Sequence, residues 1–351
     1  MKLALIYSGG TVGSTGSPLN PLPISDFQAL WGRHVASELP EVLAVDWQWL
    51  EPPLDSSDMT PADWGRLANM VLDARQEQAV LLLHGTDTMA WTAAALAFLL
   101  TLYDPNGRPV GRFGKPVVLT GSQLPLFEGD GIRLGTDALA NLRLAIDACG
   151  AGRAEVMVAF GGSVLSGARV MKMSTTADDT FDCPKGQAPC PVLPAAPAGE
   201  LLAQLDRLGP HLGKKAVVGV TPNPTDGVLV VDKIEPIVER LGEKLGAIYL
   251  NSYGIGNFPC KEKLAPLLRA AHDRGTLIIA GSQLPYGDVD PSAYGAGHWL
   301  AECGAISTAD MATPAVHAKL HVAMALGAAN GWEQAEIERF FRTPVAGELR
   351  A

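Results

Sequence analysis

A chain of 351 residues exceeds what a single hydrophobic core usually fills, so we expect two domains. Its composition, with 47% hydrophobic and 18% charged residues, is that of an ordinary globular protein, and no apolar stretch is long enough to predict a membrane span. A net charge of −10 without a run of Lys and Arg disfavours nucleic acid and acidic membranes as partners.

In the first half of the chain, short apolar runs alternate with helical patterns. Strands are predicted at 3–7, 42–49, 80–83, 116–119 and 156–160. Helices are predicted at 26–34, 61–74, 89–102 and 136–148, with a loop rich in Ser, Gly, Pro and Asn at 14–24. Continuous apolar strands separated by helices are typical of a parallel sheet buried on both faces. The sequence therefore predicts an α/β fold with a larger N-terminal domain built on a doubly wound, mostly parallel sheet.

A stretch with five prolines and two glycines, residues 183–199, predicts a linker. We expect an N-terminal catalytic domain over 1–190, a linker region over 183–205 and a smaller C-terminal α/β domain over 206–351. In that second domain, strands are predicted near 216–220, 227–231, 246–250 and 276–280, and helices near 261–274, 314–327 and 332–341.

The five cysteines are odd in number and widely spread, which does not suit a disulfide framework. Cys183 and Cys190 lie close together, but their spacing fits neither a CxxC redox motif nor a zinc knuckle. The apolar residues that precede Ser8 are too few for a signal peptide. We therefore expect reduced thiols and a cytoplasmic location.

Three polar turns follow three of the predicted strands: Ser8–Thr11, His84–Thr88 and Thr120–Gln123. Ligands of parallel α/β sheets bind beyond the carboxyl ends of the strands, where these turns would gather. The first turn lacks both the GxGxxG spacing and the GK[ST] of nucleotide-binding loops, and a purely structural tight turn remains the alternative. The gathered hydroxyls predict nucleophilic chemistry on a small polar substrate.

The second turn is the more specific signal, because Thr86 and Asp87 place a hydroxyl beside a carboxylate. A helix N-cap would explain either Asp87 or Thr88, but not both together with Thr86. A hydroxyl nucleophile needs a neighbouring base or cation, and Lys172 is a candidate. Lone lysines are usually solvated, so spacing alone leaves its role open.

These motifs resemble those of the bacterial L-asparaginase family, specifically its cytosolic type I branch. Residues 7–13, Tyr-Ser-Gly-Gly-Thr-Val-Gly, are similar to the family motif that carries the nucleophilic threonine, which implies that role for Thr11. Residues 84–89 match the motif HGTDTM letter for letter, so its threonine and aspartate fall on Thr86 and Asp87.

The resemblance extends to most of the chain. The family lysine falls on Lys172, three residues after Arg169, and the serine that binds the substrate carboxylate falls on Ser56. It further implies a dimer contact at the active site, in a homodimer or homotetramer, with no cofactor or metal. The residues expected to bind substrate are Gly10, Ser56, Ser57, Thr86, Asp87 and Ser122.

One departure from the family pattern concerns a loop tyrosine that helps to activate the threonine. The corresponding position here is Pro21, and no tyrosine lies between residues 8 and 102. Tyr7 should pack in the core, whereas Tyr253 or Tyr286 could reach the site from the other domain or from a second copy of the chain. Low activity, another substrate or a substitute group are the possible consequences.

The expected reaction is hydrolysis of the side-chain amide of L-asparagine through an acyl-enzyme. In this interpretation Thr11 attacks, while Thr86, Asp87 and Lys172 accept and return the proton. Two alternatives remain open. A pocket separates a difference of one methylene by only about 1–3 kcal/mol, so glutamine or another small amide could be the substrate. A non-catalytic sensor that binds an amino acid is the other.

Overall fold

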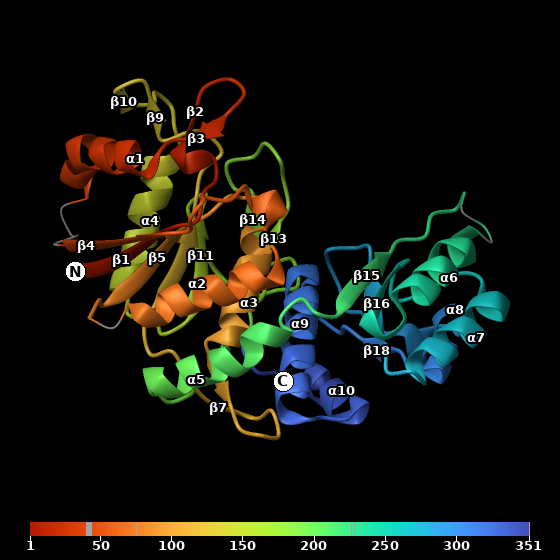
Figure 1. The fold of residues 1–351 in the computed structure, drawn as a ribbon. Coiled ribbons are helices and arrows are strands. Elements are labelled where there is room, and N and C mark those ends of the chain that lie inside the picture. Colours follow the sequence, from red (N-terminus) through yellow and green to blue (C-terminus); the bar gives the residue numbers. More distant parts are fainter. Residues whose placement is uncertain (40–43, 75, 226, 228, 351) are drawn as a thin grey trace.

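The larger sheet lies in the N-terminal half of the computed structural model, which describes residues 1–39, 44–74, 76–225, 227 and 229–350 (Figure 1). Its six strands run in the order β12-β11-β8-β5-β1-β4. All neighbours are parallel except β11 and β12, which form an antiparallel edge. Their bounds are β1 Lys2–Tyr7, β4 Ala44–Trp49, β5 Ala79–Leu83, β8 Val117–Thr120, β11 Val156–Phe160 and β12 Ser163–Ser166. The predicted doubly wound, mostly parallel sheet is thus confirmed.

Helices cover both faces of this sheet, which explains the continuous apolar strands. In β1, Leu3 and Leu5 face one hydrophobic core, while Ala4 and Ile6 face the other. The first core includes α1 Ile24–Leu30 and α4 Ala138–Gly150, and the second includes α2 Pro61–Asp73 and α3 Met89–Leu99. Because β1 is buried on both sides, it is fixed firmly, and so is the start of the turn that follows it.

The C-terminal half forms a second, smaller parallel sheet in the order β15-β16-β17-β18. Its strands are β15 Ala216–Val220, β16 Leu245–Ser252, β17 Leu277–Ser282 and β18 Ile306–Ser307. One face packs on α6 Leu229–Leu241 and α7 Lys261–His272. The other packs on α9 Thr313–Asn330, which also contacts α3 and lies between the two sheets (Figure 1). The helix α9 therefore joins the two halves through one shared core.

Shorter elements complete the chain. The two-residue to four-residue strands are β2 Ser14–Thr15, β3 Asn20–Pro21, β6 Thr101–Tyr103, β7 Pro109–Arg112, β9 Phe127–Glu128, β10 Gly131–Ile132, β13 Met171–Lys172 and β14 Phe181–Asp182. The remaining helices are α5 Ala198–Leu208, α8 Gly295–His298 and α10 Gln334–Arg342, with 3-10 turns that include η1 Thr11–Gly13 and η4 Ser56–Asp58. No helix in the described ranges has the length and apolar character needed to cross a membrane.

One predicted element is wrong. The strand expected at 227–231 includes residue 228, which lies outside the described residues, but Leu229–Val231 form the first turn of α6. Val230, Ile234 and Val238 are all buried at a spacing of four, so the apolar run is one end of an amphipathic helix. Of the strand predicted at 42–49, residues 42 and 43 also lie outside the described part.

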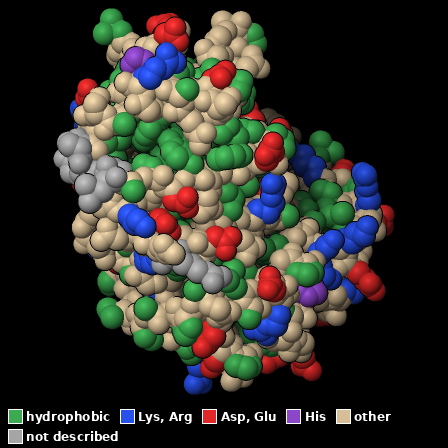
Figure 2. Space-filling model, turned by 60° about the vertical axis from the view of Figure 1, so that its left-hand side comes forward, with side chains coloured by type: hydrophobic (Ala, Val, Ile, Leu, Met, Phe, Trp, Pro, Cys, Tyr) green, Lys and Arg blue, Asp and Glu red, His purple; other side chains and the backbone are tan. Residues whose placement is uncertain are grey.

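The predicted linker region contains a helix, since α5 begins at Ala198. Gln204 on α5 donates to the carbonyl of Thr101 at 2.8 Å and accepts from the amide of Tyr103 at 3.0 Å, which fixes α5 to the N-terminal half. The domain limits at 190 and 206 stay a prediction. On the face drawn in Figure 2, Lys and Arg are interspersed with Asp and Glu rather than gathered.

Candidate active site

The turns that follow β1, β5 and β8 are in contact with one another. Gly10 has φ of 96°, a conformation that favours glycine, and a Cβ there would lie 2.5 Å from the Cα of Gly85. A Cβ on Gly121 would collide with the carbonyl oxygen of His84. Glycine at these positions therefore allows the three turns to interlock at the carboxyl ends of neighbouring strands.

A cluster of three polar side chains lies at the second turn. The Nζ of Lys172 donates to Thr86 Oγ1 at 2.9 Å and to Asp87 Oδ1 at 2.7 Å. Thr86 is buried and the Lys172 side chain is only 17% exposed, whereas that of Asp87 is 66% exposed. An ion pair this exposed contributes at most about 1 kcal/mol to stability. Its geometry suits proton transfer and ligand binding better than it suits stabilisation.

The start of α3 resolves the N-cap alternative for this turn. Thr88 occupies the N-cap position, but its side chain makes no capping hydrogen bond and donates instead to the carbonyl of Ser56 at 2.7 Å. The carboxylate of Asp87 is therefore not used to cap α3. It is held by Lys172, with acceptor capacity left toward solvent.

Lys172 is positioned from behind by Arg169, a role that sequence reasoning missed. The fully buried guanidinium donates to the Asp310 carboxylate at 2.8 Å and to the carbonyls of Lys185 and Glu348 at 2.7 and 2.8 Å. Burial would raise the pKa of Asp310, but the hydrogen bonds from Arg169 and Arg350 hold it below its usual value. An arginine placed between apolar Ala168 and Val170 was the signal available in the sequence.

Thr11 begins η1 and is half-buried, with Val12 and Gly13 buried behind it. Its hydroxyl makes no hydrogen bond with any residue in the described ranges. Because Gly10 touches Gly85, the residue after Gly10 and the residue after Gly85 belong to adjoining turns. Thr11 and Thr86 are those two residues, so the structure brings the two predicted threonines to the same edge of the sheet.

The three predicted serines differ in their surroundings. Ser56 in η4 is buried, and its Oγ lies against Gly85, where a Cβ would collide with it. Ser57 is exposed and donates to Asp55 at 2.8 Å, while buried Ser122 donates to the carbonyl of Leu124 at 2.5 Å. Ser56 is thus placed at the second turn, whereas the other two hydroxyls make local hydrogen bonds.

His84 holds the second turn in place. Its buried ring lies with Nδ1 2.7 Å from the carbonyl oxygen of Gly85 and Nε2 2.9 Å from the Oγ1 of Thr92. Burial lowers the pKa of His84 to about 4. A neutral imidazole that donates to Gly85 and accepts from Thr92 satisfies both contacts, so His84 acts as a structural residue at a strand end.

The position of the missing loop tyrosine lies on a hairpin. Pro21 on β3 is exposed and pairs with Ser14 on β2. Tyr7 is buried, stacks on Phe27 with ring centroids 5.0 Å apart, and has a pKa raised by burial to about 12. Tyr7 therefore packs in the core, as expected. A contribution of Tyr253 or Tyr286 from a second copy of the chain stays a prediction.

Metal-ligating side chains are scattered rather than clustered. In the part of the chain that the structure describes, no three His, Cys, Asp or Glu side chains gather in a way that could hold a metal ion. The chemistry available at the interlocked turns is that of hydroxyls, one carboxylate, one amine and backbone N–H groups.

Both halves of the chain match known protein families. Residues 2–192 match the family described as asparaginase, N-terminal, and residues 234–341 match the glutaminase/asparaginase C-terminal domain. L-asparaginase 1 of Escherichia coli (strain K12) is 33% identical over 330 residues, which cover 91% of this chain and 90% of that protein. A protein of the glutamyl-tRNA(Gln) amidotransferase of Pyrobaculum aerophilum is 31% identical over 367 residues, which cover 99% of this chain and 80% of that protein.

Solved structures agree with these matches. L-asparaginase I from Vibrio cholerae superposes with a TM-score of 0.76 at 26% identity, covering 100% of this chain and 99% of that one. The thermostable L-asparaginase from Thermococcus kodakarensis gives a TM-score of 0.74 at 25% identity over the full length of both chains.

Proposed function

The chain belongs to the asparaginase family of amidohydrolases, and we propose that it hydrolyses the side-chain amide of L-asparagine to L-aspartate and ammonia. The membership confirms the resemblance predicted from the motifs. The observation that carries the proposal is the contact of Lys172 with both Thr86 and Asp87, beside the turn that presents Thr11.

In the proposed mechanism the Oγ1 of Thr11 attacks the amide carbon and forms a tetrahedral intermediate. Its proton passes by way of Thr86 to the Lys172–Asp87 pair and is returned to the departing ammonia. The C–N bond then breaks and leaves a β-aspartyl ester on Thr11. Attack by water on this ester releases aspartate and restores the threonine hydroxyl.

Binding groups surround the same point. Backbone N–H groups of the glycine turns at Gly10 and Gly85 would hold the oxyanion, a contribution often worth about 3 kcal/mol per donor. Ser56 would bind the substrate α-carboxylate, and the exposed oxygen of Asp87 would bind the α-ammonium as a charge-assisted pair. Ser57 and Ser122 are proposed to line the pocket from either side.

Ammonia release tests the nucleophile. Thr11→Ala is expected to abolish ammonia production from L-asparagine, whereas Thr15→Ala on the adjoining hairpin, a threonine-to-alanine control, should retain most of it. Thr86→Val and Lys172→Met should each reduce turnover about 10²–10⁴-fold while the circular dichroism spectrum stays native. Undiminished activity in Thr11→Ala would move the nucleophile to another residue.

Glutamine is the second candidate substrate. The C-terminal match is to a domain shared by glutaminases and asparaginases, and a one-methylene difference is discriminated only weakly. Parallel assays with L-asparagine, L-glutamine and D-asparagine decide between them. Asparagine binding by calorimetry without ammonia release from any amide would favour the sensor alternative instead.

The replaced loop tyrosine bears on assembly. If a second copy covers the site, as the family resemblance implies, the protein should form a homodimer or homotetramer. Activity that falls on dilution in parallel with dissociation would support a contribution from the second copy. The cytoplasmic location likewise stays a prediction.

A further inference from the structure

Three cationic side chains in the described ranges are more than nine-tenths buried: Arg112, Arg169 and Lys319. Lys319 binds the Glu348 carboxylate and the carbonyl of Thr343, and Arg169 binds the Asp310 carboxylate and several carbonyls. Arg112 differs from both. Its Nη1 contacts the Sγ of Cys190, while its Nε and Nη2 are buried without a hydrogen-bond partner in the described part of the chain.

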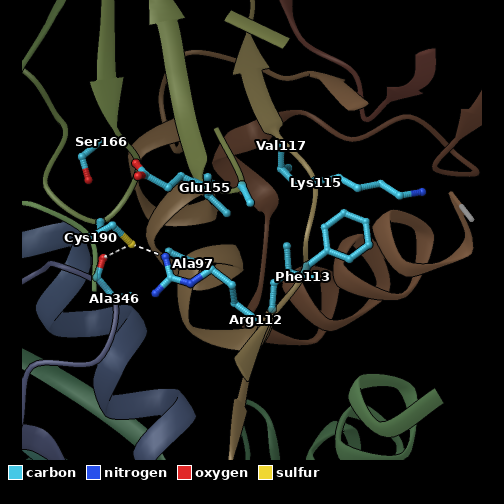
Figure 3. Close-up of a pocket in the computed structure, with 13 residues that line it drawn as sticks. Ala97, Arg112, Phe113, Lys115, Val117, Glu155, Ser166, Cys190 and Ala346 are labelled. Carbon is cyan, nitrogen blue, oxygen red and sulfur yellow. Dashed lines mark hydrogen bonds between the residues drawn. The ribbon is translucent and has the colours of Figure 1, made fainter. Parts of the chain in front are cut away.

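The backbone around Arg112 holds this side chain in place. The amide of Arg112, at the end of β7, donates to the carbonyl of Pro194 at 3.0 Å, and its carbonyl accepts from Ala196 at 2.7 Å. The guanidinium points toward Cys190 and Ala346, with Glu155 nearby (Figure 3). Between them lies a cavity of about 20 Å³, which we call the Arg112 cavity. It has room for one water-sized group.

The other charged groups of the Arg112 cavity already have partners. Lys115 donates to the carbonyl of Ala74 at 2.7 Å, and Glu155 is paired with Arg153 at 2.8 Å. No carboxylate among the described residues lies within ion-pair distance of the Arg112 guanidinium. A guanidinium does not lose its proton in a protein, and a buried charge without a partner costs several kcal/mol.

We propose that the Arg112 cavity binds a small inorganic anion of halide size, such as chloride, between Nε and Nη2 of Arg112. The thiol of Cys190 closes one side, since its Sγ accepts from Arg112 and donates toward the carbonyl of Ala346 at 3.4 Å. The anion would tie the linker and the C-terminal tail to β7. Stability should therefore depend on halide, while the chemistry at Thr11 should not.

The cavity residues offer variants that separate anion from water. Arg112→Gln removes the two free donors. Arg143→Gln is the matched control, because it removes the same charge from a surface arginine paired with Glu38. Glu155→Gln leaves the donors and removes the carboxylate from the lining, so it should tighten anion binding several-fold.

The experiment compares thermal midpoints in sodium bromide and in sodium gluconate at equal ionic strength. Relative to Arg112→Gln, the wild-type protein and Arg143→Gln should each gain about 2 °C in bromide, and Glu155→Gln should reach this gain at a lower bromide concentration. A bromide-soaked crystal should show an anomalous peak within hydrogen-bonding distance of Arg112.

Two results would overturn the proposal. One is a bromide response that is the same in the wild-type protein and in Arg112→Gln. The other is a crystal in which a water without anomalous signal bridges Arg112 and Glu155. If Arg112→Gln does not fold, a Glu155→Gln response no stronger than that of the wild-type protein overturns it equally.

Discussion

Two lysine–carboxylate pairs in this chain have the same chemistry and opposite surroundings. Lys319 and Glu348 are both 0% exposed, whereas the side chains of Lys172 and Asp87 are 17% and 66% exposed. In the buried pair, Glu348 also accepts from the backbone amide of Ala346 at 2.8 Å. Burial lowers the pKa of Lys319, and the Glu348 charge opposes that change.

The difference separates a structural pair from a functional one. The polar atoms of the buried pair are taken by protein partners, so it can only hold the C-terminal tail against α9. The carboxylate of Asp87 keeps acceptor capacity toward solvent, which is what a substrate ammonium group requires. The comparison indicates that the incomplete pair is the one available for chemistry.

The largest expected effect concerns the buried pair. Glu348→Ala should lower the free energy of unfolding by about 3–5 kcal/mol, because it leaves the Lys319 cation buried without its partner. Urea denaturation measures this loss. The double variant Lys319→Met/Glu348→Leu should recover most of it, since an apolar pair of similar volume avoids the cost of the unpaired charge. A loss below about 1 kcal/mol in Glu348→Ala would show that solvent reaches the pair.

The next effect is the pH dependence contributed by His84, whose pKa burial lowers to about 4. The unfolded chain binds the imidazole proton near pH 6.5, so the unfolded state carries more protons between pH 6.5 and 4. The contribution of His84 is therefore complete above pH 6.5 and declines as the pH falls, by roughly 3 kcal/mol in all.

His84→Gln, which can still bond Thr92, isolates this contribution. The unfolding free energy of the wild-type protein minus that of the variant should fall between pH 6.5 and 4. His321→Gln is a useful companion, because burial also lowers the pKa of His321 to about 4. A difference between wild-type protein and His84→Gln that does not vary with pH would mean that the ring is charged in the fold.

The sequence was enough to predict the sheet and the residues of the interlocked turns, for physical reasons. Strands buried on both faces are apolar throughout, and β1 and β5 follow that pattern. A turn that must approach another backbone needs glycine, as Gly10 does beside Gly85. Both signals are local, so they can be read without the fold.

Other features depend on contacts between distant residues. Leu229–Val231 looked like a strand because a short apolar run has no period of its own, and packing against the second sheet made it a helix. The partners of Arg169 and Arg112 lie up to 179 residues away, so a pattern along the chain could not tell the satisfied arginine from the unsatisfied one.

A smaller effect is expected where the structure supports the catalytic lysine. Arg169→Lys keeps the charge but loses the planar fork that reaches Asp310 and three or more carbonyls, so β13 should shift. We expect kcat to fall about tenfold to a hundredfold with KM less affected, because misplacement of a catalytic group slows the chemical step. Steady-state kinetics checks this, with Arg66→Lys on the exposed surface of α2 as control. Equal losses in kcat and in folded fraction would reduce Arg169 to a stabilising residue.

The smallest effect is expected for stability at the exposed pair. Asp87→Ala removes the carboxylate partner of a lysine, as Glu348→Ala does, but water can solvate the Lys172 amine that remains. The free energy of unfolding should therefore change by less than about 1 kcal/mol, while ammonia release is lost with the substrate-binding group. Denaturation of the two alanine variants under the same conditions measures the contrast directly. If Asp87→Ala destabilised the protein as much as Glu348→Ala, the pair would be an element of the fold, and the proton transfer proposed for Lys172 would lose its main support.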